Sequence, residues 1–218
     1  MYRKFVKRML DILFASTFVA LLFLPLALLG IWIKLDSHGP ILFKQKRAGK
    51  DLVPFTVYKF RSMTTDAPKN SPTNSLSNAS TYITRSGKIL RKLSLDELPQ
   101  LLNVLKGEMS IVGPRPVVLN ETDLLSRREK YRANSCKPGI TGWAQVNGRD
   151  ELRVHQKAKM DGEYVKHFGA FMDAKCLFMT IWAVLSVSGH KEGHEVQDTY
   201  EEVPSQRNVT RYNAEEGN

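Results

Sequence analysis

Residues 92–107 read KLSLDELPQLLNVLKG, and this stretch decides the fold. Ser94 and Glu97 stand three residues apart, which is the capping-box pattern and predicts a helix that begins at Ser94. Leucines recur at helical spacing and give this helix one apolar face: Leu98, Leu101, Leu102 and Leu105. Gly107 is of the residue type that commonly follows a helix, so the predicted helix ends there.

Asp96 falls in the first turn of that predicted helix. The helix dipole and the unpaired backbone N–H groups stabilise an ionised carboxylate there, and the cations Arg91 and Lys92 lower its expected pKa further. A helix N-terminus also attracts phosphate, so an ionised Asp96 is a candidate nucleophile toward phosphorus. The alternative is that Asp96 and Glu97 only cap the helix, and the S-x-x-E pattern alone favours that alternative.

A short rigid segment follows, VGPRP at residues 112–116. Its two prolines limit the backbone freedom of Arg115 and hold the guanidinium ready to bind phosphate, whereas an ordinary Pro-rich turn is the alternative. Residues 137–149, KPGITGWAQVNGR, read as a structured loop, and they match neither common glycine-rich phosphate-binding motif. The candidate nucleotide contacts in this loop are Gln145, Asn147 and Arg149.

The charge of the 218-residue chain is uneven, although its net value is +10. From Lys191 onward seven acids and three bases give −4, which leaves +14 on residues 1–190. A basic body with an acidic tail indicates an anionic partner: nucleic acid, anionic lipid or a phosphorylated substrate. Cys136 and Cys176 are the only cysteines, which is no disulfide framework and fits a reducing compartment.

The run from Ile12 to Ile33 has 22 residues without a charged side chain, long enough for a helix to cross a bilayer. Basic residues flank both ends, so their distribution gives no orientation. Pro25 removes a backbone hydrogen bond near the middle of the run and predicts a kink. A re-entrant helix, which bends at Pro25 and leaves on the side it entered, satisfies both flanks, but hydropathy alone favours a single span. Asp11 either pairs with Arg8, three residues before it, at the membrane interface, or is a surface charge that marks the start of the helix.

Short β-prone segments and amphipathic segments make up much of the remaining chain. Ile41–Arg47 and Phe55–Met63 predict a hairpin, in which Lys59 and Arg61 share one face and either hold a phosphate or are solvated. The remaining predicted elements are a basic amphipathic helix at Ile83–Leu93, a helix at Glu151–His167 and an interfacial or core helix at Met172–Val187.

The content and order of these motifs resemble the bacterial sugar transferases, also called monotopic phosphoglycosyl transferases. The motifs are K-R-x-x-D from Lys7, YKFRSM from Tyr58, SLDELPQ from Ser94, NVLKGEMS from Asn103, VGPRP from Val112 and KPGITGWAQVNGR from Lys137. The resemblance covers roughly Lys7 to His194 and is strongest to minimal members, such as the enzyme that initiates bacterial N-linked glycosylation. It implies a mostly helical α+β fold: a re-entrant membrane helix (1–36), a catalytic domain with interfacial amphipathic helices and a small β-hairpin (37–194), and a polar tail (195–218).

The resemblance also implies a reaction. These enzymes transfer a sugar-1-phosphate from a UDP-sugar to undecaprenyl phosphate and release UMP, with Mg²⁺ and a covalent aspartyl intermediate. The expected sugar is an N-acetylated hexosamine or a diacetamido-trideoxyhexose. By this resemblance Asp96 is the nucleophile, Glu97 and Asp96 hold Mg²⁺, and the substrate contacts are Lys59, Arg91, Arg115, Gln145, Asn147 and Arg149.

The resemblance further implies a location. It places Lys7, Arg8 and Asp11 at the membrane interface and Pro25 at the break of the helix. The protein is then expected on the cytosolic face of the bacterial inner membrane, in contact with its lipids; a homodimer is compatible with this, and no nucleic acid is involved. The alternative from the basic charge is a membrane-anchored nucleic-acid-binding protein or scaffold.

Overall fold

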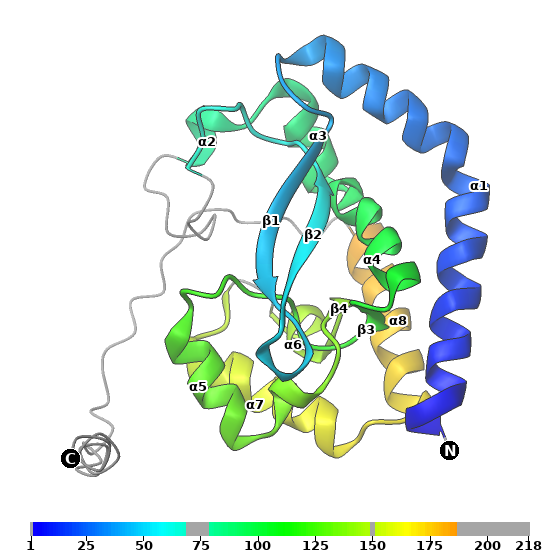
Figure 1. The fold of residues 1–218 in the computed structure, drawn as a ribbon, viewed down its shortest axis with the longest axis vertical. Helices are drawn as coiled ribbons and strands as arrows, with labels where there is room; N and C mark the ends of the chain where they lie inside the picture. The colour runs from blue at the N-terminus through cyan, green and yellow to red at the C-terminus, as the bar shows by residue number, and fades with distance from the viewer. Residues whose placement is uncertain (1, 69–78, 149–150, 187–218) are drawn as a thin grey trace, which may run out of the picture.

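The computed structural model describes residues 2–68, 79–148 and 151–186 (Figure 1). A short π-helix, η1 (Tyr2–Val6), leads into the long helix α1 (Lys7–Asp36). Within the described residues α1 is the one helix long and apolar enough to cross a membrane, and most of its length is exposed. The predicted apolar helix is therefore confirmed. The predicted polar tail, 195–218, lies outside the described residues.

Helix α1 bends as it passes the rest of the molecule. Figure 1 shows it running along one side and then turning over the end of the domain, toward the hairpin. Pro25 lies inside the helix and has no N–H to donate, which is a common cause of such a bend. The bend agrees with the kink predicted at Pro25.

The hairpin predicted from the β-prone segments is confirmed. Strand β1 (Leu42–Ala48) pairs antiparallel with β2 (Pro54–Phe60), and the turn between them contains the 3-10 helix η2 (Lys50–Leu52). Phe43 lies opposite Lys59 in this register. A second small sheet joins β3 (Ser110–Val112) and β4 (Gly139–Thr141) in parallel, which brings two of the sequence motifs together.

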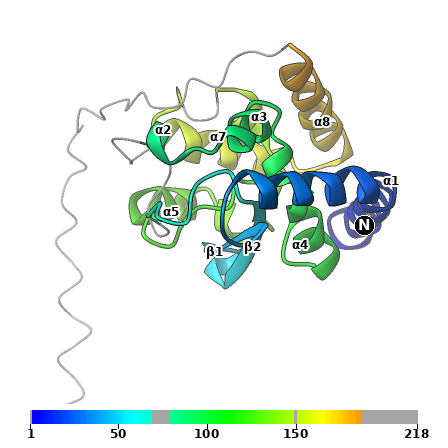
Figure 2. The same ribbon diagram turned by 90° about the horizontal axis from the view of Figure 1, so that it is seen from above.

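Helices make up most of the remaining structure, so the predicted mostly helical α+β class is confirmed. They are α2 (Ala79–Tyr82), α3 (Arg85–Lys92), η4 (Leu95–Gln100), α4 (Leu101–Lys106), α5 (Thr122–Lys130), η5 (Ala133–Ser135), α6 (Trp143–Val146), α7 (Val154–Lys166) and α8 (Ala170–Leu185). Figures 1 and 2 place α8 on the same side of the molecule as the first half of α1. The predicted basic amphipathic helix is α3, and the predicted C-terminal helices are α7 and α8.

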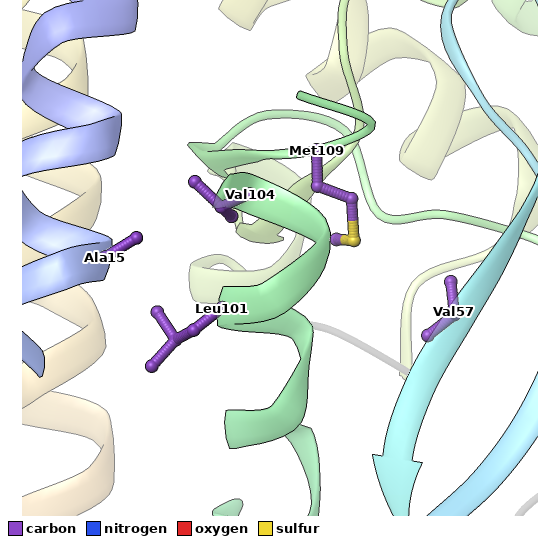
Figure 3. Packing of buried hydrophobic residues seen from close by; sticks show 5 residues of the cluster. All are labelled: Ala15, Val57, Leu101, Val104 and Met109. Atoms are coloured by element: carbon purple, nitrogen blue, oxygen red, sulfur yellow. The ribbon is translucent and has the colours of Figure 1, made fainter. Parts of the chain in front are cut away.

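A small apolar core fastens α1 to the domain. Figure 3 shows Ala15 of α1 facing Leu101 and Val104 of α4, with Met109 and Val57 of β2 on the far side of α4. Ala15 and Val104 are fully buried, and the small alanine lets the two helices approach closely. The core thus fixes α4, and with it the segment before α4, relative to both the hairpin and the apolar helix.

The predicted capping box at Ser94 is wrong. Residues 95–100 form the 3-10 helix η4, and regular α-helix begins only at Leu101. Ser94 adopts a left-handed conformation (φ 54°) and its side chain makes no capping hydrogen bond. Pro99 inside η4 has no N–H, which prevents one α-helical hydrogen bond there. The predicted end is confirmed, because Gly107 is left-handed (φ 87°) and follows the last residue of α4.

Candidate active site

The 3-10 helix η4 carries two adjacent carboxylates, Asp96 and Glu97, that differ in burial and in access to a pocket. Asp96 is half-buried and lines a pocket of about 150 Å³, whereas Glu97 is buried. The other charged residues that line the pocket are all cations: Arg47, Lys59, Arg61 and Arg91. One carboxylate facing four cations is an arrangement suited to an anionic substrate attacked by a carboxylate oxygen.

Glu97 holds two cations beside Asp96. Lys59 Nζ and Arg115 Nη2 both donate to Glu97 Oε1, each at 2.9 Å. The Lys59 and Glu97 side chains are largely buried, at 19% and 9% exposure, so this ion pair is shielded from solvent. Glu97 therefore fixes the ammonium and the guanidinium in place around the neighbouring carboxylate.

The pKa of Asp96 is shifted in the direction opposite to the prediction. Burial raises it above the ordinary value of 3.8, and the charge of Glu97 adds to the rise, while Lys59, Arg91 and Arg115 oppose it. The predicted lowering assumed a regular helix whose dipole acts on Asp96, but η4 is a 3-10 turn of six residues. Burial also lowers the pKa of Lys59, and the Glu97 carboxylate opposes that shift.

Arg47 is a site residue that the sequence did not reveal. It is one of four basic residues in or beside β1, and the signal that distinguishes it is strand alternation, which puts it on the face of Phe43 and Gln45, opposite the exposed Lys44 and Lys46. Its guanidinium donates to Gln45 Oε1 at 2.9 and 2.6 Å and to the Pro116 carbonyl oxygen at 3.2 Å. Burial lowers the pKa of Arg47 to about 10, and the nearby Arg115 charge contributes.

The backbone of the VGPRP segment is held from two sides. The Gly113 N–H donates to the Thr141 carbonyl and the Gly139 N–H to the Pro114 carbonyl, both at 2.9 Å. A side chain at Gly142 would overlap the Gly113 carbonyl oxygen, so this close approach requires glycine. The glycine-rich loop therefore supports the segment that carries Arg115.

A buried ion pair supports the same segment from behind. Arg128 of α5 donates from Nη1 to the Arg115 carbonyl oxygen at 3.0 Å. Arg128 also pairs with Asp161 of α7, with nitrogen–oxygen distances of 2.8 and 2.6 Å, and both residues are buried. These contacts link α5 and α7 to the position of the Arg115 side chain.

Comparison with known proteins matches the sequence of this chain to one family. The sequence model described as bacterial sugar transferase matches residues 2–187, which include both carboxylates and the VGPRP segment. The chain belongs to the bacterial sugar transferase family. The resemblance inferred from the motifs is thereby confirmed.

Three relatives show how this sugar transferase compares in length. An uncharacterized sugar transferase of Bacillus subtilis, EpsL, is 43% identical over 164 residues, 75% of this chain and 79% of the relative. The undecaprenyl-phosphate glucose phosphotransferase of Komagataeibacter xylinus is 44% identical over 186 residues, 80% of this chain and 35% of the relative. The UDP-glucose:undecaprenyl-phosphate glucose-1-phosphate transferase of Escherichia coli is 38% identical over 200 residues, 82% of this chain and 40% of the relative. The chain thus spans less than half the length of the last two relatives.

The structure brings some of the predicted site residues of this sugar transferase together. Asp96, Lys59 and Arg91 line the pocket, whereas Arg115 lies outside its lining and donates to Glu97, the residue after Asp96. The structure does not bring Gln145 and Asn147 to the pocket lining, because their amides donate to Ile140 and Trp143 carbonyls of their own segment at 2.9 and 2.7 Å. Arg149 lies outside the described residues. Contact of these three with substrate stays a prediction.

The predicted interface residues form a different network from the one expected. The partner of Asp11 is Lys7 at 2.8 Å, so the expected pairing of Arg8 with Asp11 is wrong. Arg8 donates instead to the Val104 and Leu105 carbonyls at the end of α4, at 2.6 and 3.0 Å. Lys7 also pairs with Asp173 of α8 at 3.2 Å, and Asp11 accepts from the Ile111 N–H at 3.1 Å. These charged side chains therefore bind α1 to α4, α8 and β3.

Proposed function

We propose that this protein transfers a sugar-1-phosphate from a UDP-sugar to undecaprenyl phosphate and releases UMP. The observation that carries the proposal is Asp96 in a cationic pocket, with Lys59 and Arg115 held beside it by Glu97. The names of two relatives describe transfer to undecaprenyl phosphate, one of them from UDP-glucose. UDP-glucose therefore stands beside the expected UDP-N-acetylhexosamines and diacetamido-trideoxyhexose donors as a candidate substrate.

In the first step Asp96 acts as the nucleophile. A carboxylate oxygen attacks the β-phosphorus of the UDP-sugar, an oxygen–phosphorus bond forms, and the bond from the β-phosphorus to the bridging oxygen breaks. UMP leaves with the bridging oxygen and its electron pair. Lys59, Arg91 and Arg115 are the cations whose charge acts on Asp96, and they would neutralise charge that develops on the phosphate oxygens.

In the second step the lipid acceptor regenerates the enzyme. A phosphate oxygen of undecaprenyl phosphate attacks the phosphorus of the aspartyl phosphosugar, and the bond between that phosphorus and Asp96 breaks. The carboxylate is released, and the product is the lipid diphosphate sugar. Two displacements through one carboxylate divide the transfer into steps that each use the same cationic surroundings.

Mg²⁺ is part of this proposal, and the donor set is compatible with it. Among the described residues no group of three or more His, Cys, Asp or Glu side chains converges, so a dedicated protein cage does not exist there. Mg²⁺ is commonly held by one or two carboxylates together with substrate phosphates and water, and Asp96 with Glu97 supplies that number. When bound, Mg²⁺ would neutralise charge on the diphosphate.

The location proposed is the cytosolic face of the bacterial inner membrane, with α1 re-entering rather than spanning. Helix α1 exposes large apolar side chains along its length, and α8 on the same side exposes Phe171, Phe178 and Trp182. The Lys7–Asp173 pair joins the two helices near the start of α1. Labelling of single cysteines should find both ends of α1 on one side of the membrane, and labelling on opposite sides would exclude re-entry.

The activity is tested by incubating the purified protein with polyprenyl phosphate and a panel of UDP-sugars. UMP release is expected with at least one donor, and Asp96→Asn should abolish it. Asp123→Asn is the matched control, because Asp123 is an exposed aspartate that pairs with Arg127 on the surface of α5. Normal UMP release by Asp96→Asn, or salt-dependent DNA binding without UMP release by the native chain, would reject the proposal.

A further inference from the structure

Asn103 of α4 is fully buried, and its side-chain amide is bonded on both sides. Its Oδ1 accepts from the Tyr58 N–H at 3.1 Å. Its Nδ2 donates to the Thr56 carbonyl oxygen and to Glu108 Oε2, both at 2.7 Å. Both N–H groups of the amide and its oxygen therefore have partners, which allows this polar side chain to be buried.

Two of these partners are backbone groups of β2 that lie two residues apart. The N–H and carbonyl groups of residues i and i+2 in a strand face the same edge. One edge of β2 pairs with β1, and the part of the chain that the structure describes has no strand on the other edge. The Asn103 amide therefore bonds to the free edge of β2, at Thr56 and Tyr58, as a neighbouring strand would.

This pair of hydrogen bonds fixes the position of β2 along α4. The same two elements also meet in the apolar core, where Val57 and Val104 belong to one cluster. Apolar contacts have no direction, whereas the amide requires a carbonyl and an N–H at one spacing. A shift of β2 by one residue would present to Asn103 the edge groups that face β1 instead.

The two elements that Asn103 joins carry the charged groups of the site. Lys59 follows Tyr58 in β2, and η4, with Asp96 and Glu97, leads directly into α4. The Lys59–Glu97 pair at 2.9 Å bridges the same two segments. A displacement of β2 against α4 would therefore lengthen this pair and change the distance from the ammonium to the Asp96 carboxylate.

We propose that Asn103 is a positioning residue that acts through Lys59. It lies outside the pocket lining, and its amide holds β2 in the register that places the Lys59 ammonium beside Asp96. This inference rests on the proposed transferase function, in which Lys59 neutralises charge on the donor phosphates. Loss of the amide would leave the Tyr58 N–H and the Thr56 carbonyl without partners, which favours movement of β2 away from α4.

Asn103→Leu tests this role, because leucine has nearly the same shape and no polar group. Single-turnover UMP release should fall at least about tenfold, since a small misplacement of a catalytic charge is costly. Asn134→Leu is the matched control: Asn134 is also buried, and its amide donates to the Leu125 carbonyl oxygen and to Glu129 Oε2, both at 2.9 Å. The control should lose a similar unfolding free energy and release UMP at the native rate. Equal falls in UMP release for the two variants would overturn the inference.

A second measurement follows the position of Lys59 without catalysis. Lys59 is paired with Glu97 and its side chain is 19% exposed, so an amine-acylating reagent should modify it slowly. Peptide mass spectrometry should show Lys59 acylated at least about tenfold faster in Asn103→Leu, because its pair opens more often. Lys7, which pairs with Asp11, is the internal reference and should keep its native rate. Reduced UMP release with unchanged acylation of Lys59 would overturn the inference.

A second variant is used if Asn103→Leu does not fold. Asn103→Asp combined with Glu108→Gln keeps an acceptor for the Tyr58 N–H and a hydrogen bond between positions 103 and 108. It places a carboxylate oxygen against the Thr56 carbonyl oxygen, and this repulsion should produce the same two effects. Absence of UMP release by the native chain with every donor would instead reject the proposed function, whereas the acylation of Lys59 would still test whether Asn103 positions it.

Discussion

Variants of the buried pair Arg128 and Asp161 should affect the stability of the protein and its activity to different extents. Arg128 and Asp161 are 5% and 1% exposed, and Arg128 also donates to the Arg115 carbonyl oxygen at 3.0 Å. Asp161→Leu leaves the guanidinium buried without its carboxylate. Breaking a buried pair in this way costs about 3–5 kcal/mol of unfolding free energy.

The double variant Arg128→Met with Asp161→Leu removes both charges together. Apolar residues of similar volume often replace a buried ion pair without loss of stability, so the double variant should recover most of the unfolding free energy. It leaves the Arg115 carbonyl without its donor, so UMP release should stay below that of the native chain. Urea unfolding in detergent, followed by tryptophan fluorescence, measures the first quantity, and single-turnover UMP release measures the second.

The chain offers a matched control on the same helix. Arg127 and Asp123 form an ion pair at 2.8 Å, but their side chains are 33% and 60% exposed. Asp123→Leu should cost no more than about 1 kcal/mol, because exposed pairs contribute little. A double Arg128/Asp161 variant with native activity would refute the claim that this pair positions Arg115, and equal losses for Asp161→Leu and Asp123→Leu would refute the role of burial.

Three further predictions concern pH, packing and the metal. Burial raises the pKa of Asp96 above 3.8 and only the ionised carboxylate attacks, so the acid limb of UMP release should lie at a higher pH than the pKa of an exposed aspartate. Burial lowers the pKa of Lys59 below 10.5, so the basic limb should lie at a lower pH than the pKa of an exposed lysine. A pH–rate profile of the first half-reaction tests both limbs. Gly142→Ala should lower UMP release at least about tenfold by displacing the segment that carries Arg115, while Gly169→Ala, whose nearest contact would be 3.8 Å away, should not. Removal of divalent ions with EDTA should abolish UMP release and added Mg²⁺ should restore it; full activity in EDTA would contradict the role of Mg²⁺.

The sequence predicted what depends on local pattern. Apolar length located α1, two β-prone segments located the hairpin of β1 and β2, and a glycine at position 107 located the end of α4. The carboxylates and Arg115 were selected because their types and order resemble those of a family, and the family match confirms that resemblance.

The sequence did not predict what depends on packing between distant segments. In the sequence Glu97 fits a capping box, but in the structure it accepts hydrogen bonds from Lys59 and Arg115, which come from other segments of the chain. The desolvation that raises the Asp96 pKa comes from the surrounding elements, so a local argument from the dipole gave the wrong sign. Arg47 was missed because strand alternation places it opposite Lys44 and Lys46 but does not show that its face lines a pocket.

The central claim is that the Asp96 carboxylate becomes covalently bonded to the phosphorus of the donor. Native protein incubated with the active UDP-sugar and no lipid, then digested rapidly at low temperature, should yield a peptide carrying the mass of a sugar phosphate on Asp96. Addition of polyprenyl phosphate before digestion should remove that mass. A sugar phosphate found on another side chain, or full transfer to lipid without any covalent adduct, would contradict the account.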